Sequence, residues 1–204
     1  MKILLKELKQ WYFDLFYEQS ISLGEFGNWI CTTGELASDV FEEPDYLFLI
    51  ETNFDDSFAI HRLRLLLKKY LPHIETECET HLLQRKLERT LQMPFLSMVE
   101  EIDDLRTFQR YPLTELGITP YNDADVWNFR EVHPSAVSES VYEKSFPNLR
   151  KQINRVVDRL RTGEVLIVAE GEEGREKSYR YIDQRIQSAN GAINDNIIDI
   201  SKKG

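Results

Sequence analysis

The sequence of 204 residues has few cysteines and no long apolar run. Its two cysteines, Cys31 and Cys78, have no paired spacing that would indicate a disulfide framework or a zinc knuckle, so a reducing compartment is favoured. No stretch approaches the roughly 20 apolar residues that a membrane-spanning helix needs. The N-terminal segment MKILLKELKQWYFDLF is interrupted by charged residues where a signal peptide would be apolar. We therefore expect a cytoplasmic protein, neither secreted nor inserted in a membrane.

Sequence motifs for nucleotide cofactors and covalent catalysis are also missing. The chain contains no G-x-x-x-x-G-K-[ST], no G-x-G-x-x-G and no G-x-S-x-G. His73 and His81 lie near Cys78, but their spacings match no standard zinc site and no fourth ligand follows. The sequence therefore predicts no cofactor and no resident metal, and it makes an enzyme the less favoured class.

Positive charge is scarce. The chain has 25 Lys and Arg against 35 Asp and Glu, a formal charge of −10, with a pI near 5.0. This balance argues against a protein whose whole surface binds nucleic acid or anionic lipid, and it suits one that meets a basic partner. The charge is uneven: residues 1–75 and 76–140 carry −6 each, whereas residues 141–204 carry +2.

Helical periodicity is what the chain has in abundance. Apolar residues recur at intervals of three and four over residues 2–19, 75–91 and 149–160, which predicts amphipathic helices there. Gly163 is expected to close the last of them. Ser22 with Glu25, and Thr32 with Glu35, have the spacing of capping boxes and predict two helix starts.

Two stretches favour strands. Residues 44–54, PDYLFLIETNF, are compatible with a buried strand or a helix, and their aromatic content slightly favours the strand. Residues 164–201 predict a strand–helix–strand element, with a buried strand at 165–169, a helix carrying Tyr179, Ile182 and Ile186, and a short strand at 197–200. The expected fold is mainly α, with this small element near the C-terminus.

The distribution of proline suggests how the chain is divided. Four of the seven prolines fall within residues 111–147, which are still too apolar for a free linker. We expect a helical acidic region at 1–110, an ordered irregular connection at 111–147, and a helix with a small α/β element at 148–204. A single domain over 1–204 fits the same pattern.

Residues 21–71 carry a resemblance to a known class of proteins. The matching positions are Ile21-Ser22-Leu23, Phe26, Trp29-Ile30, Glu35-Leu36, Tyr46, Leu49-Ile50, Asn53-Phe54 and the leucine-rich stretch after Asp55-Asp56. In this pattern the segment resembles small bacterial immunity proteins that neutralise toxins. The match covers about a quarter of the chain, and residues 93–204 have no counterpart in it.

The resemblance implies stoichiometric binding to a basic toxin domain, without catalysis. Acidic side chains would steer association with such a domain, because many toxins are nucleases with positive clefts. The candidate contact residues are the carboxylates of two acidic stretches, Glu42, Glu43, Asp45, Asp55 and Asp56, and the run Glu100, Glu101, Asp103 and Asp104.

An alternative is a metal-dependent enzyme acting on nucleic acid or nucleotides. The segment VLIVAEGEEG resembles the first motif of Toprim domains, in which the glutamate matching Glu170 works beside a metal, but the later Asp-x-Asp motif is missing. Asp123 and Asp125 have a spacing that can present two carboxylates to a cation. Lys151, Arg155 and Arg159, with Arg150 and Arg161, form a basic helix face over 150–161 that would contact phosphate or dock on the acidic 100–104 run.

Overall fold

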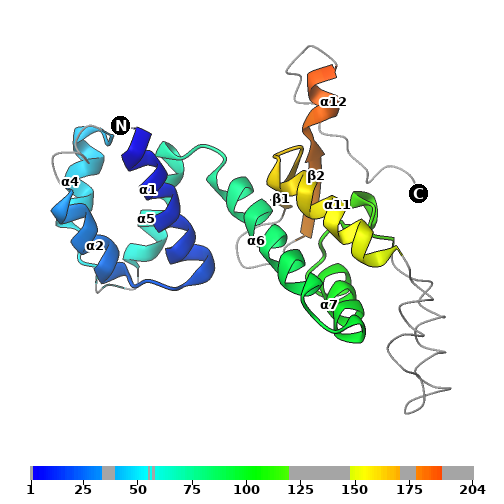
Figure 1. The fold of residues 1–204 in the computed structure, drawn as a ribbon. Helices are drawn as coiled ribbons and strands as arrows, with labels where there is room; N and C mark the ends of the chain where they lie inside the picture. Colours follow the sequence, from blue (N-terminus) through cyan, green and yellow to red (C-terminus); the bar gives the residue numbers. More distant parts are fainter. Residues whose placement is uncertain are drawn as a thin grey trace. The chain divides into compact units, whose positions relative to one another are not determined.

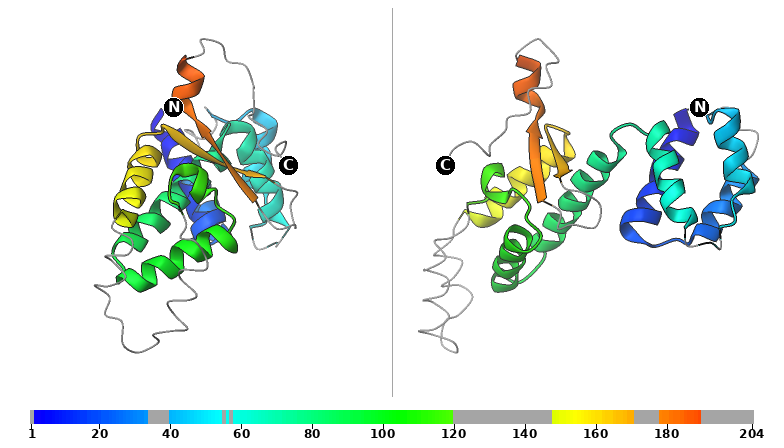
Figure 2. Two further views of the ribbon diagram at one scale, coloured as in Figure 1. Left: turned by 90° about the vertical axis from the view of Figure 1, so that its right-hand side faces the viewer. Right: turned by 180° about the vertical axis from the view of Figure 1, so that it is seen from behind.

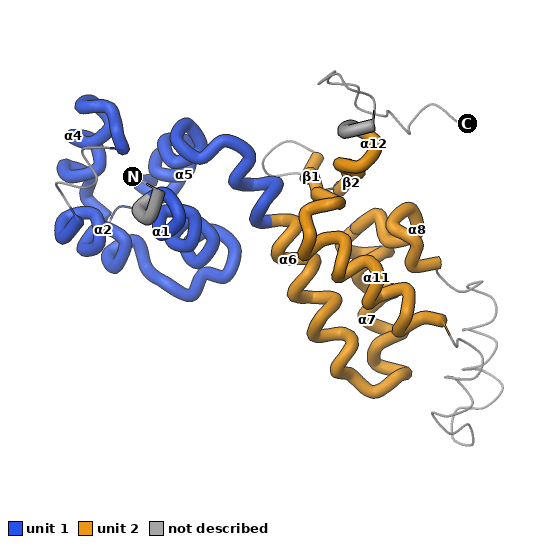
Figure 3. The backbone as a smooth tube through the Cα atoms, turned by 45° about the horizontal axis from the view of Figure 1, so that its top comes forward, with its two compact units in different colours: residues 1–78 blue, residues 79–204 orange. Residues whose placement is uncertain are grey.

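The computed structural model describes residues 2–33, 40–54, 56, 58–119, 148–170 and 178–189, with the backbone alone at 2–4 and 187–189. Helices dominate these residues, and one small antiparallel sheet lies near the C-terminus, which confirms the expected mainly α fold (Figure 1). The chain divides into two compact units, residues 1–78 and 79–204 (Figure 3). The boundary falls within helix α6, Ile74–Leu91. Most of the predicted 111–147 connection is outside the described residues, so the predicted domain scheme stays a prediction.

The first unit is a set of short helices around an aromatic core. Its largest fully buried side chains include Tyr12 and Phe26, and the ring of Phe26 contacts both Trp11 and Trp29. The aromatic cluster of the first helix thus forms core rather than surface. The elements are α1 (Lys2–Phe13), the π-helical turn η1 (Asp14–Glu18), α2 (Leu23–Thr32), α4 (Glu43–Glu51) and α5 (Ala59–Tyr70), followed by the start of α6.

The N-terminus of α2 has the predicted capping box. The Ser22 hydroxyl accepts from the backbone N–H of Glu25 at 3.2 Å, and the Ser22 N–H donates to the Glu25 carboxylate at 2.7 Å. The prediction of a second helix start at Thr32 is wrong at that residue. Thr32 is the last residue of α2, and its hydroxyl donates to the carbonyl of Trp29, as threonine does within a helical turn. Glu35 lies outside the described residues.

Helix α4 replaces the strand that residues 44–54 slightly favoured. Pro44 occupies the first turn, where its missing N–H costs nothing, and Glu43 and Asp45 complement the helix dipole there. The core of the helix, YLFLI, is apolar on every side, so periodicity could not separate a strand from a helix.

The second unit packs three long helices around a β-hairpin (Figures 1 and 2). The predicted helices over 75–91 and 149–160 are confirmed as α6 and α11, and Gly163, with a φ of +72°, follows the end of α11. The elements beyond α6 are α7 (Phe95–Thr107), α8 (Leu113–Leu116), α11 (Leu149–Arg161), β1 (Val165–Glu170), β2 (Ser178–Asp183) and α12 (Gln184–Ala189).

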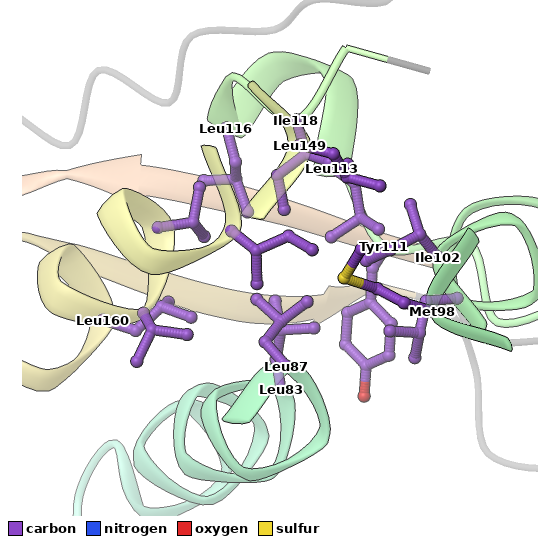
Figure 4. Packing of buried hydrophobic residues seen from close by; sticks show 14 of the residues in the cluster. Leu83, Leu87, Met98, Ile102, Tyr111, Leu113, Leu116, Ile118, Leu149 and Leu160 are labelled. Atoms are coloured by element: carbon purple, nitrogen blue, oxygen red, sulfur yellow. The ribbon is translucent and has the colours of Figure 1, made fainter. Parts of the chain in front are cut away.

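A single apolar cluster forms the core of this unit. Figure 4 shows side chains from α6, α7, α8 and α11 converging on one volume, with Met98 and Tyr111 facing Leu87 and Leu83. Two strand residues, Val165 and Ile167, are fully buried against the same cluster. The ring of Tyr111 stacks on that of Tyr179, with centroids 4.3 Å apart, and so ties β2 to the core.

The predicted order of the C-terminal element is wrong in one respect. Residues 178–183 form a strand, antiparallel to β1, with Val165 opposite Asp183 and Glu170 opposite Ser178. A helix over Tyr179 and Ile182 was expected because Tyr179, Ile182 and Ile186 have helical spacing. Pairing with the buried strand β1 overrides that spacing, since β1 offers a full ladder of partners. The strand expected at 197–200 lies outside the described residues.

Helix α6 also satisfies a backbone donor of the sheet. The N–H of Ile167 donates to the hydroxyl of Thr80 at 2.8 Å, and both residues are buried. Thr80→Val is expected to lower the free energy of unfolding by about 1.5 kcal/mol, because the N–H of Ile167 would lose its acceptor without gaining water. Urea denaturation followed by circular dichroism measures the change.

Thr80→Ser is the matched control, because it keeps the acceptor and removes only a methyl group. We expect the free energy of unfolding to fall by no more than about half of the loss in Thr80→Val. Equal losses in the two variants would show that packing, and not the hydrogen bond, sets the cost.

Candidate partner-binding surface

Two of the predicted contact carboxylates are engaged inside the first unit. The ammonium group of Lys69 lies 2.6 Å from a Glu42 oxygen and 2.8 Å from an Asp45 oxygen. The Tyr70 hydroxyl donates to Asp45 as well. The hydrogen bonds from Lys69 and Tyr70 hold the pKa of the Asp45 carboxyl below its ordinary value. These two carboxylates therefore join α4 to the end of α5, and they are less available to a partner than their charge suggested.

The remaining predicted carboxylates of this stretch differ in whether they are exposed and bonded to other residues. Glu43 is exposed and has no interaction partner within the described residues. Asp56 is exposed, and one of its oxygens accepts from the backbone N–H of Phe58 at 3.0 Å. Asp55 lies outside the described residues. Glu43 and Asp56 are therefore the predicted acidic residues of the first unit that can face a partner.

The acidic run on α7 is mostly occupied by its neighbours in the second unit. Arg106 lies 2.7 Å from Asp103, and Arg89 lies 3.7 Å from Glu101. The Gln109 amide donates to Asp104 at 2.7 Å. Glu100 is exposed and also has an interaction partner. The run and the Glu42–Asp56 stretch belong to different units.

Sequence reasoning missed an exposed apolar strip on α4. Leu47 and Ile50 are each 42% exposed and lie three residues apart on one face of the helix. Exposed Glu43 precedes Leu47 by one turn, and exposed Glu51 follows it by one turn. The available signal was the apolar sequence YLFLI itself. A short helix that is apolar all round cannot bury every face against one core, because only one side meets the neighbouring helices.

A pocket of about 280 Å³ opens at the C-terminal end of α4 and the first turn of α5. Two acidic residues, Glu51 and Asp56, line it together with Arg62. Phe48 is the aromatic residue among its described lining residues. The complete lining is Phe48, Glu51, Thr52, Asn53, Asp56, Ala59 and Arg62. A volume of this size suits one long side chain of a partner better than an extended small molecule.

Of the residues of the enzymatic alternative, the structure describes Glu170 and the basic helix face over 150–161. Glu170 ends β1 and forms an ion pair with Arg180 at 2.5 Å, across the hairpin. Asp123 and Asp125 lie outside the described residues. Within the described residues, no three His, Cys, Asp or Glu side chains lie together as metal ligands would. The enzymatic alternative stays a prediction without an observation in its favour.

The basic face of α11 has neighbours other than the acidic 100–104 run. Arg150 donates to the backbone carbonyls of Leu91 and Met93, at 2.7 and 3.3 Å. Arg161 lies 2.9 Å from Glu88. Arg159 lies 2.7 Å from Asp183, at the end of β2. These arginines hold α11 to the rest of the second unit.

No helix in the described ranges is long and apolar enough to cross a membrane. The chain was also compared with protein-family models, with curated protein sequences and with solved structures. None of the three comparisons finds a match to this chain.

Proposed function

We propose that the chain is a non-enzymatic binding protein whose first unit captures a protein with a basic surface, in the way that an immunity protein masks a toxin domain. The observation that carries the proposal is the exposed strip of α4, in which Leu47 and Ile50 lie between Glu43 and Glu51. In Figure 1 this helix lies at the edge of the first unit.

The strip has the composition of a small binding surface. Protein interfaces combine an apolar centre, from which water is excluded, with a polar rim that sets orientation. Leu47 and Ile50 supply the apolar centre, and the two glutamates supply an acidic rim. An acidic rim selects a partner whose own rim is basic, since like charges would repel.

The charge of the whole first unit favours the same partner. Residues 1–78 contain 7 Lys and Arg against 14 Asp and Glu, a formal charge of −7. Much of the positive charge is neutralised locally, because Lys68 and Arg64 both bind Glu75, at 2.8 Å each. Such a surface accelerates encounter with a basic protein and does so most strongly at low salt.

The pocket beside the strip supports an anchor for one basic side chain. A lysine or arginine of the partner that entered it would meet Glu51 and Asp56, with the ring of Phe48 beside its aliphatic stem. Arg62 shares the pocket wall and limits its negative charge. The pocket is therefore assigned a secondary role, and the apolar strip the main one.

The position of the resemblance is consistent with this assignment. Residues 21–71, which resemble immunity proteins, fall entirely within the first unit, residues 1–78. The proposal includes a cytoplasmic location, which the two free cysteines favour, since reduced thiols persist in that compartment. The acidic run on α7 is left out of the proposed contact surface, because its carboxylates have partners in their own unit.

The proposal is tested in two steps with the full chain. Cross-linking in the native cells and mass spectrometry identify candidate partners, and the candidate is then purified and titrated by calorimetry. We expect a basic protein, bound with a stoichiometry of one to one. Leu47→Glu combined with Ile50→Glu is expected to weaken binding about 100-fold or more, because each central apolar residue contributes about 2 kcal/mol to such an interface.

Leu65→Glu is the matched control. Leu65 is 56% exposed on α5, so its replacement tests the effect of adding a carboxylate to an exposed leucine of the same unit outside α4. We expect it to change the affinity less than about threefold. A partner without a basic surface, or equal losses in the control and in the double variant, would contradict the proposal. A toxin partner would in addition be neutralised in a growth assay by the wild type and not by the double variant.

A further inference from the structure

The second unit has an open groove along the exposed face of α11. Its volume is about 510 Å³, and it runs past the last residues of the helix toward the start of α12. Four cations and two carboxylates line it, so its own walls carry a positive excess within a negatively charged protein. The lining residues are Lys151, Asn154, Arg155, Asp158, Arg159, Thr162, Glu164 and Arg185.

Two of these cations stand out by their lack of a partner. Every other lysine and arginine of the described second unit has an ion pair, a hydrogen bond or another polar interaction. Lys151 and Arg155 have none within the described residues. Both are exposed, and they lie one helical turn apart on the same face of α11. The groove therefore offers two uncompensated positive charges at a fixed spacing.

The carboxylates on the groove wall are already neutralised. Asp158 binds Arg161 at 3.2 Å. Glu164 lies 3.5 Å from Arg185 and 3.9 Å from Arg159. Neither carboxylate is within ion-pair distance of Lys151 or Arg155, so the excess charge of those two residues faces the groove.

From this arrangement we propose that the groove binds the phosphate backbone of a single nucleic-acid strand. Positions four residues apart in an α-helix are separated by about 6 Å along its axis, so Lys151 and Arg155 can each contact one of two neighbouring backbone phosphates. Arg159 continues the row by one turn, but its charge is already paired with Asp183. Arginine is suited to phosphate because its planar guanidinium donates two hydrogen bonds to one group.

An acidic protein segment would present similar charges, but the groove wall favours nucleic acid. Protein interfaces have an apolar centre, whereas nucleic-acid interfaces are more polar and more positive. Four of the eight described residues that line the groove are cations, and none of the eight has a purely hydrocarbon side chain. Among the described lining residues there is no aromatic ring on which a base could stack, so binding is independent of sequence and sensitive to salt.

The net charge of −10 does not prevent local binding. At physiological ionic strength the screening length is about 8 Å, so carboxylates well beyond the groove contribute little to the potential inside it. The proposal concerns the second unit alone and does not rest on the function proposed for the first.

Fluorescence anisotropy of the full chain with a labelled 12-nucleotide thymidine oligomer, in about 50 mM salt, tests the proposal. Lys151→Glu combined with Arg155→Glu is expected to weaken binding at least tenfold. It is also expected to reduce the slope of log affinity against log salt by about 1.4, because each phosphate contact on a single strand contributes about 0.7. Neither side chain forms an ion pair with another described residue, so circular dichroism should stay unchanged.

The matched control is Arg85→Glu combined with Arg89→Glu, which makes the same charge change at the same spacing on α6. We expect its affinity to stay within about twofold of the wild type. An absence of oligomer binding by the wild type, or equal weakening in the two double variants, would overturn the proposal. Binding of polyglutamate in place of the oligomer would overturn it in favour of an acidic protein partner.

Discussion

Replacing Asp183 with asparagine is expected to lower the free energy of unfolding of the second unit by about 3 kcal/mol at pH 7. Asp183 ends β2, and its side chain is only 10% exposed. It lies 2.7 Å from Arg159 of α11 and 2.7 Å from Arg185 of α12. Its carboxylate therefore joins three elements of the unit through two guanidinium groups.

The cost arises mainly from Arg159, whose side chain is 17% exposed. Asparagine preserves the shape of the side chain but removes the charge, and the next anion, Glu164, is 3.9 Å from Arg159. Removing one partner of a poorly solvated ion pair costs about 3 kcal/mol or more, because the other charge stays buried. Hydrogen exchange of peptides from α11 and β1, together with urea denaturation, measures the loss in the unit concerned.

Asp158→Asn provides the control. Asp158 lies on α11 and pairs with Arg161, but its side chain is 69% exposed, so solvent already screens the pair. We expect a loss of less than about 0.5 kcal/mol. Similar losses at Asp158 and Asp183 would contradict the assignment of Asp183 as a buried link.

The same carboxylate makes stability depend on pH in a defined window. Hydrogen bonds from Arg185, and the charges of Arg185 and Arg159, lower the pKa of Asp183 from 3.8 to about 2. A carboxyl with a lowered pKa in the folded state contributes its full stability above pH 3.8, and this contribution is lost as the pH falls through 2. Between pH 4 and pH values below 2, the free energy of unfolding is expected to fall by about 2 kcal/mol through protonation of Asp183. In Asp183→Asn this part of the acid dependence should be absent, which denaturation at pH 7, 4 and 2.5 would show.

The fold was predictable where periodicity and burial agree. Helices α6 and α11 repeat their apolar residues with the helical period over three to five turns, and their positions were predicted within one or two residues. Helix α4 was not, because the five apolar residues YLFLI at its centre have no polar face to reveal their period. Strand β2 was mistaken for a helix, because Tyr179, Ile182 and Ile186 have helical spacing, whereas the residues that share a strand face and pack on the core are Tyr179 and Tyr181, and only the partner strand β1 decides between the two periods.

The candidate site was predictable in its charge but not in its geometry. The acidic character of residues 42–56 is evident from the sequence. The pairing of Glu42 and Asp45 with Lys69 is not, because it joins residues more than 20 positions apart. Exposure of Leu47 and Ile50 depends on which face of α4 docks on the core, and that is settled by tertiary packing. An exposed apolar strip of this kind can therefore be recognised only from the tertiary structure.

Replacing Gly27 with alanine is expected to destabilise the first unit by about 2 kcal/mol, although alanine is the better helix former. Gly27 is buried in α2, and an added Cβ would lie 2.5 Å from Cδ2 and 2.9 Å from Cε2 of Phe54. The ring of Phe54 in turn packs edge-on against Phe26, at a centroid distance of 6.1 Å. The ring cannot move away without disturbing that contact, so overpacking outweighs the gain of about 1 kcal/mol from helix propensity.

Gly24→Ala in the same helix is expected to have the opposite sign. Gly24 is exposed, and the nearest atom to an added Cβ is the Ser22 hydroxyl at 3.9 Å, so only the helix propensity changes and stability should rise by up to about 1 kcal/mol. Phe54→Ala supplies a further check in a double-mutant cycle. If the ring is the source of the clash, Gly27→Ala should cease to be destabilising once the ring is removed. A loss that persisted without the ring would place the strain in the backbone of α2 and contradict the packing argument.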